Sequence, residues 1–212
     1  PTAPLRDGYV FFGWDRSFSA IYEDTDVMAT YMVANVDINN QEEFVAYLTA
    51  PTIPGVTYHL KDNIVLPSDW ASIDLVANID GGGYTLYNFG KVPVFSALTG
   101  NVSNLIIDGY NSETEAKTEV KIEGDHKNFG VLASELDGGT ISDVVIRNYI
   151  IKSWRYTTMG ALVAIMSNGA TICRVNIEDS CELLGRESYV GGIVGRFQRT
   201  ANYCPVDEEG NV

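Results

Sequence analysis

The residues best suited to chemistry in this 212-residue chain are acidic side chains within or just after short apolar blocks, namely Asp108, Asp143, Glu178 and Asp179. Two carboxylates held a few ångströms apart can hydrolyse a glycosidic bond. Carboxylates that bind Ca²⁺ beside a basic residue can instead support cleavage by proton abstraction. Either reaction needs carboxylates at equivalent positions of neighbouring strands, but Asp108 follows its apolar block whereas Asp143 lies inside the next one. We therefore expect no paired-carboxylate active site and no enzyme activity.

Three charged residues do share one position of the aligned blocks. Glu178 aligns with Asp108, and Arg147 occupies the same position in the block between them. Charges of alternating sign on neighbouring strands are typical of surface ion pairs, which contribute little to stability. We interpret this set as a surface ion-pair ladder. A polysaccharide-cleaving enzyme is the alternative.

Histidine and cysteine suggest neither a nucleophile nor a zinc site. The histidines of the sequence are His59 and His126, the latter in a predicted loop, and a catalytic thiol would need a histidine beside it. The three cysteines match no zinc spacing and cannot all pair with one another. We interpret Cys173 and Cys204 as small buried thiols.

A glycine-rich segment, Asp80-Gly81-Gly82-Gly83, resembles a calcium-binding turn. The repeating glycine-rich nonapeptide of calcium-binding coils is absent, however. Consecutive glycines supply the positive φ angles that a tight turn requires. We therefore predict a simple turn here, and neither calcium nor another cofactor.

The best candidate for binding is an aromatic and basic cluster, Trp154, Arg155 and Tyr156. Aromatic and arginine side chains dominate the energetics of many interfaces, and aromatic rings also stack on sugars. The alternative is that these side chains fold over a neighbouring part of the chain and bind nothing.

Composition limits the range of partners. The formal net charge is −14, from 28 Asp and Glu against 14 Lys and Arg, so we expect no nucleic-acid partner. No apolar run approaches the ~20 residues of a membrane helix, and we expect no membrane insertion. The chain opens on Pro1 without a signal peptide, which indicates a trimmed piece of a longer protein, and we expect a monomer.

The elements that would position these residues are short repeats. Three eight-residue segments align from Gly100, Gly139 and Ala170, with aliphatic residues at shared positions such as Val102, Ile141 and Ile172. A second block contains the repeated glycines, which we align as Gly130, Gly160 and Gly192, with Gly195 completing the last block. Gly130 to Gly160 is 30 residues, Gly160 to Gly192 is 32, and Val102 to Ile141 is 39.

A period near 30 residues with short β-branched blocks predicts a solenoid in which each repeat forms one coil. Helical repeats would need longer segments of helical periodicity, and a propeller would need more strands per repeat. We predict an all-β, right-handed parallel β-helix of about four coils over residues 76–212. The longer step contains residues 111–127, which we predict as an inserted loop.

The N-terminal third has different patterns. Alternating apolar residues predict two strands, at 9–12 and 26–33, in a short β module over residues 1–34. Asn40, followed by Glu43, predicts a helix start, and Pro51 ends that helix. Residues 35–75 would then be a linker with this helix, which caps the solenoid, and a first strand at 58–66.

Two family resemblances follow from these motifs. Ile79-Asp-Gly-Gly-Gly-Tyr-Thr-Leu86, the block from Gly100 and the block Gly191-Gly-Ile-Val-Gly195 resemble the GLUG-motif repeats of bacterial secreted and surface proteins. Residues 4–31, with Gly8-Tyr-Val-Phe-Phe-Gly-Trp14, are similar to the C-terminal half of an internalin-type B-repeat, also called the Listeria-Bacteroides repeat.

These resemblances imply an extracellular bacterial protein, secreted or displayed on the cell surface. They predict a non-enzymatic adhesion module whose partner is a host or matrix protein or a glycan. A purely structural spacer in a larger secreted protein is a further alternative.

Overall fold

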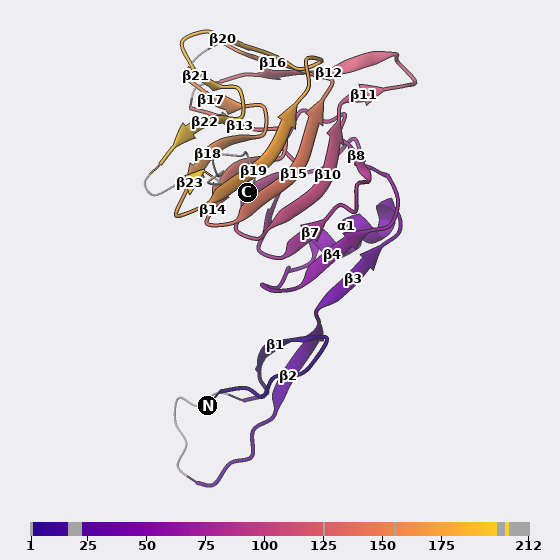
Figure 1. The fold of residues 1–212 in the computed structure, drawn as a ribbon, viewed down its shortest axis with the longest axis vertical. Helices are drawn as coiled ribbons and strands as arrows, with labels where there is room; N and C mark the ends of the chain where they lie inside the picture. The colour runs from indigo at the N-terminus through magenta and orange to yellow at the C-terminus, as the bar shows by residue number, and fades with distance from the viewer. Residues whose placement is uncertain (1, 17–22, 125, 155, 199–201, 204–212) are drawn as a thin grey trace, which may run out of the picture.

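Short parallel strands stack on one another in the computed structural model, which describes residues 2–16, 23–124, 126–154, 156–198 and 202–203 (Figure 1). The longest sheet follows the order β23-β19-β15-β10-β7-β4-β3. Its strands are β3 (Asn35–Ile38), β4 (Thr57–Leu60), β7 (Asn78–Asp80), β10 (Val102–Asp108), β15 (Thr140–Arg147), β19 (Thr171–Ile177) and β23 (Asn202–Tyr203). Two short strands extend it, with β5 (Ile64–Val65) on β8 (Thr85–Tyr87) and β8 on β10.

Further sheets close each turn of the chain. A five-stranded sheet contains β6 (Ile73–Leu75), β9 (Phe95–Leu98), β14 (Ala133–Asp137), β18 (Val163–Ser167) and β22 (Val194–Phe197). A four-stranded sheet contains β11 (Tyr110–Asn111), β12 (Ala116–Ile122), β16 (Tyr149–Ser153) and β20 (Glu182–Gly185). A three-stranded sheet contains β13 (Asn128–Phe129), β17 (Thr158–Gly160) and β21 (Tyr189–Gly191).

The interior consists of stacked aliphatic side chains. The register pairs Val102 with Ile141 and Ile141 with Ile172, as the sequence alignment predicts. Val102 and Ile141 are fully buried, because each side chain packs between neighbouring turns of the chain. The described residues therefore form the predicted mostly β, parallel solenoid-like fold.

The helix α1 (Gln41–Thr49) begins where the sequence predicts. The Asn40 side chain accepts a hydrogen bond from the Glu43 backbone N–H over 2.9 Å, which satisfies one of the free donors at the helix start. Phe44 and Leu48 are buried, and the Phe44 ring lies 5.7 Å from the ring of Trp70. The helix packs beside β5 and β6, at the N-terminal end of the stack.

The observed strands differ from the predicted boundaries in two places. β3 and β4 pair in parallel with each other and β4 with β7, so the long sheet already begins at Asn35, earlier than the predicted start at residue 76. The middle of the segment predicted as an inserted loop is β12, which pairs in parallel with β16. Its charged residues face outward while Thr118 and Val120 point inward, and this alternation is typical of a strand.

The glycine alignment is wrong by one residue in the last repeat. Gly160 lies opposite Gly191, and Val163 lies opposite Val194. A Cβ at Gly160 or Gly191 would clash with backbone carbonyl oxygens, whereas Gly192 has open space around it. Close backbone approach is therefore the reason for glycine at positions 160 and 191.

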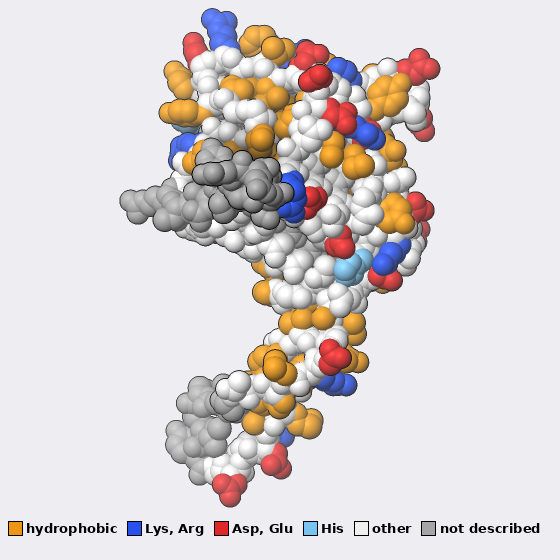
Figure 2. Space-filling view, in the orientation of Figure 1, with side chains coloured by type: hydrophobic (Ala, Val, Ile, Leu, Met, Phe, Trp, Pro, Cys, Tyr) orange, Lys and Arg blue, Asp and Glu red, His pale blue; other side chains and the backbone are white. Residues whose placement is uncertain are grey.

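An antiparallel hairpin extends from the N-terminal end of the stack (Figure 1). It consists of β1 (Tyr9–Trp14) and β2 (Ala29–Val33), in agreement with the two predicted strands. Hydrophobic side chains gather over it in Figure 2. Phe12 in β1 is exposed, as is Met28, which directly precedes β2.

Candidate functional site

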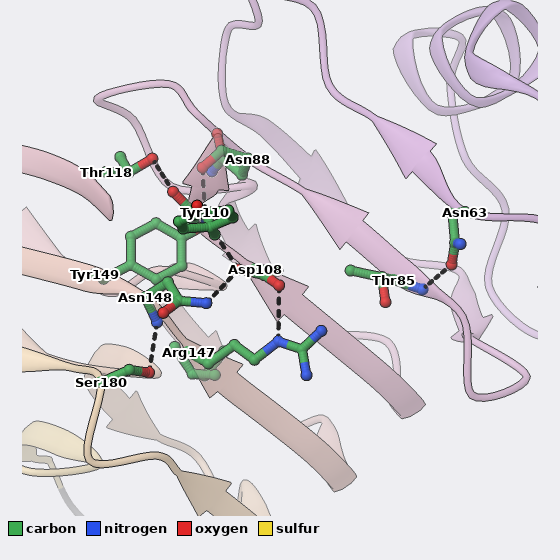
Figure 3. Close-up of polar contacts among 12 residues, drawn as sticks. Asn63, Thr85, Asn88, Asp108, Tyr110, Thr118, Arg147, Asn148, Tyr149 and Ser180 are labelled. Atoms are coloured by element: carbon green, nitrogen blue, oxygen red, sulfur yellow. Dashed lines mark hydrogen bonds and ion pairs between the residues drawn. The ribbon is translucent and has the colours of Figure 1, made fainter. Parts of the chain in front are cut away.

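The predicted charge ladder is a buried polar network centred on Asp108 (Figure 3). Arg147 Nε donates to Asp108 Oδ2 over 2.7 Å, and Asn148 Nδ2 donates to Oδ1 over 2.8 Å. The backbone N–H of Tyr110 also donates to Oδ1, over 2.8 Å. The Asp108 side chain is only 7% exposed, so its charge is stabilised by these donors and not by water.

A layer of buried polar groups supports this network. The Tyr149 hydroxyl donates to the Asn88 carbonyl oxygen over 2.8 Å, and the Thr118 hydroxyl donates to that of Gly109 over 2.7 Å. Burial raises the pKa of Tyr149 well above its ordinary value, and the nearby charge of Asp108 acts in the same direction. Tyr149 is therefore a neutral structural donor.

These contacts correct the sequence interpretation. The Asp108–Arg147 pair exists, but it is not a simple surface pair, because the Asp108 carboxylate is buried and Arg147 is half-buried. Within the described part of the chain Glu178 forms no ion pair with Arg147, and its backbone N–H donates to the Ile146 carbonyl oxygen instead. Asp143 pairs with Arg174 through two hydrogen bonds of 2.6 and 2.7 Å, away from Asp108 in the register.

A groove lies beside this network, and we call it the aromatic groove. Its rings are those of Tyr87, Phe89 and Tyr110, and Asp108 also contributes to its lining. The volume is about 660 Å³, within the range of ~300–1,000 Å³ that is common for small-molecule sites. The Tyr87 and Phe89 rings lie 6.0 Å apart, and Tyr110 is 41% exposed.

The rest of the aromatic groove is mostly neutral. An apolar part is formed by Val65, Leu66 and Pro67, and the polar part by Gln41, Ser68, Asn111, Ser112 and Glu113. Asn111 Oδ1 accepts the backbone N–H of Glu113 over 2.9 Å, which fixes the turn between β11 and β12.

Sequence reasoning missed this groove, because its lining comes from segments near residues 41, 65–68, 87–89 and 108–113. The parallel register of β8 and β10 places Tyr87 opposite Asp108 and so brings two of these segments together. A usable signal in the sequence was the presence of aromatic residues just after strand ends, at Phe89 and Tyr110.

The predicted binding cluster lies elsewhere, after β16. Trp154 is 59% exposed and Tyr156 is 56% exposed, while Arg155 lies outside the described residues. The Tyr156 ring stacks on His126 with centroids 6.1 Å apart, so this tyrosine packs against the preceding turn of the chain. Trp154 and Tyr156 are not part of the lining of the aromatic groove.

The remaining candidates have structural partners. In the predicted glycine turn, Asp80 Oδ1 accepts the Gly82 N–H over 3.1 Å, and Gly82 and Gly83 have positive φ. The residues described here contain no cluster of three or more His, Cys, Asp or Glu side chains suited to a metal ion. Cys173 is disulfide-bonded, which overturns its interpretation as a small buried thiol, and Cys204 lies outside the described residues. Cys181 is a free thiol whose pKa is raised by burial.

Comparisons with known proteins found no match among family models, curated proteins or solved structures. The two family resemblances therefore remain predictions from the residues. The described helix, α1, has neither the length nor the apolar character of a membrane span.

Proposed function

We propose that this chain is a non-enzymatic binding module of an extracellular bacterial protein, either secreted or displayed on the cell surface. The observation that carries the proposal is the aromatic groove, which offers three rings and free polar groups. The Asp108 carboxylate beside them already accepts three hydrogen bonds from the chain itself. The partner is a glycan or a host or matrix protein.

The setting rests on the sequence. The GLUG-like repeats and the B-repeat-like N-terminus support an extracellular bacterial origin, and the net charge of −14 argues against nucleic acid. We take the solenoid to be a right-handed parallel β-helix, since crossovers between parallel strands are right-handed in nearly all proteins. Such a stack is rigid, and a rigid scaffold presents a binding groove without a large ordering cost.

The state of Asp108 argues against the alternative of a polysaccharide-cleaving enzyme. A general acid or nucleophile must exchange its partner for substrate during the reaction. Asp108 receives three hydrogen bonds from the chain itself, so releasing it would leave buried donors without acceptors. The other carboxylate of the groove, Glu113, lies on the exposed turn after β11.

Two measurements on the purified chain test this proposal, one of ligand binding and one of catalytic turnover. The purified chain should bind saturably to members of an array of glycans and extracellular matrix proteins. Incubation with a polysaccharide panel should release neither reducing ends nor unsaturated sugars. Release of such products would establish an enzyme, and absence of binding across the array would favour a structural spacer.

A further inference from the structure

The aromatic groove is lined by three rings that are not fully buried by the fold. Tyr87 and Phe89 form neighbouring rings on one strand end, and Tyr110 adds a third ring from the next turn of the chain. Among the described residues, the hydroxyls of Tyr87 and Tyr110 form no hydrogen bond with protein atoms. Partly exposed aromatic rings that line one concave surface are typical of sites for ligands with both apolar and polar faces.

The polar side chains of the groove are also free. Within the described chain, the Gln41 amide and the hydroxyls of Ser68 and Ser112 form no hydrogen bond with protein atoms. An amide or hydroxyl group can both donate and accept, which suits a ligand with many hydroxyl groups.

The charge of the groove restricts the ligand further. Its lining includes no Lys or Arg, and its two carboxylates are Asp108, which is paired with Arg147, and Glu113. A uronate or sulfate group would meet the uncompensated charge of Glu113 and the field of an acidic chain. A neutral ligand avoids this repulsion.

From these observations we infer that the aromatic groove binds a neutral oligosaccharide, with Tyr87, Phe89 and Tyr110 as stacking surfaces. A pyranose ring presents C–H groups on one face, which pack on an aromatic ring, and hydroxyl groups at its edge, which pair with amides and hydroxyls. This inference rests on the proposed binding function and names its ligand class and its site.

Isothermal titration calorimetry with neutral hexasaccharides of glucose, mannose and N-acetylglucosamine tests the inference, with hexagalacturonate as the acidic counterpart. We expect at least one neutral probe to bind and hexagalacturonate not to bind. Tyr87→Ala and Tyr110→Ala should each weaken that binding roughly 10-fold or more. Tyr84→Ala removes a tyrosine of comparable exposure outside the groove and should leave the affinity unchanged.

Tyr110 is exposed on β11, so its variant keeps the test informative if the Tyr87 variant fails to fold. The inference is wrong if no neutral probe binds, if the acidic probe binds more tightly, or if both groove variants retain full affinity. Binding to matrix proteins alone would overturn the inference but leave the proposed binding function intact. Absence of any binding on the array would remove both.

Discussion

Arg147 lies directly opposite Asp108 in the parallel register of β10 and β15, and its Nε donates to Asp108 Oδ2 over 2.7 Å. The Asp108 side chain is 7% exposed, whereas that of Arg147 is 32% exposed. Arg147 therefore compensates the buried negative charge of Asp108 from a more exposed position. The Tyr110 backbone N–H and the Asn148 amide are the two further donors to the carboxylate. A buried charge of this kind is costly once a partner is lost.

Asp108→Asn should destabilise the fold by about 3 kcal/mol, because the new amide N–H₂ faces donors and leaves some of them without an acceptor. Urea denaturation at neutral pH measures this free energy. The matched control is Asp143→Asn, which breaks the exposed pair with Arg174 and should cost less than about 1 kcal/mol. Equal losses in the two variants would show that Asp108 is not the more constrained site.

The spacing of charges predicted that Asp108 and Arg147 share a column, but it could not predict their burial. Strand alternation would expose Asp108, since its neighbour Ile107 points inward. Alternation ends at the last residues of β10, where Ile107, Asp108 and the following Gly109 are all buried by the neighbouring turns. How deeply a residue at the end of a strand is buried depends on the adjacent coils, and the sequence of a single repeat contains no information about them.

The aromatic groove and the glycine register show two further limits of the sequence. The groove combines four segments separated by up to about 70 residues of chain, so no local pattern marks it. For the glycines, Gly191 and Gly192 are adjacent, and either fits a pattern of glycine before aliphatic residues. The strand register and the clash that a Cβ would cause at residue 191 distinguish them.

Replacing Gly160 tests this close approach. Gly160→Ala should cost about 2–3 kcal/mol, because its Cβ would meet the carbonyl oxygens of Val163 and Ile193 in a closely packed interior. Gly192→Ala serves as the control: it should leave stability unchanged or raise it by up to about 1 kcal/mol, since the site is open and its φ is not positive. Thermal and urea unfolding compare the two. A tolerated Gly160→Ala would contradict the observed backbone packing.

Three residues at equivalent positions of neighbouring strands have a left-handed backbone conformation, and they give another prediction. Asn104, Asp143 and Arg174 have φ angles of 52°, 56° and 46°. The parallel strand pairing includes the residues on either side of each of them but skips the residue itself. Asn104→Val should therefore be less stable than Asn104→Gly by roughly 1–2 kcal/mol, because a branched Cβ is disfavoured at positive φ. Both variants lose the hydrogen bond to Asp80, so their difference isolates the backbone effect. Equal unfolding free energies would rule out this backbone strain.

The pH dependence of stability should include a contribution from Asp80. The Asn104 amide donates to Asp80 Oδ1 over 3.0 Å and lowers the pKa of this carboxyl group below its ordinary value, with help from the Gly82 N–H and His59, although burial opposes the shift. A lowered folded-state pKa favours the ionised form in the folded protein. The resulting stabilisation is present above the unfolded-state pKa of about 3.9 and is lost as pH falls through the lower folded-state pKa.

Asp80→Asn should remove this contribution. Urea denaturation between neutral pH and about pH 2.5 should show that the parent loses more stability below about pH 4 than the variant does. Asp69→Asn, at an exposed aspartate without a hydrogen bond to any described residue, should follow the parent curve. If the Asp80→Asn curve instead parallels the parent through this range, the hydrogen bonds from Asn104 and Gly82 do not favour the ionised carboxylate. The Asp80 turn would then contribute to folding stability only through the backbone conformation of its glycines.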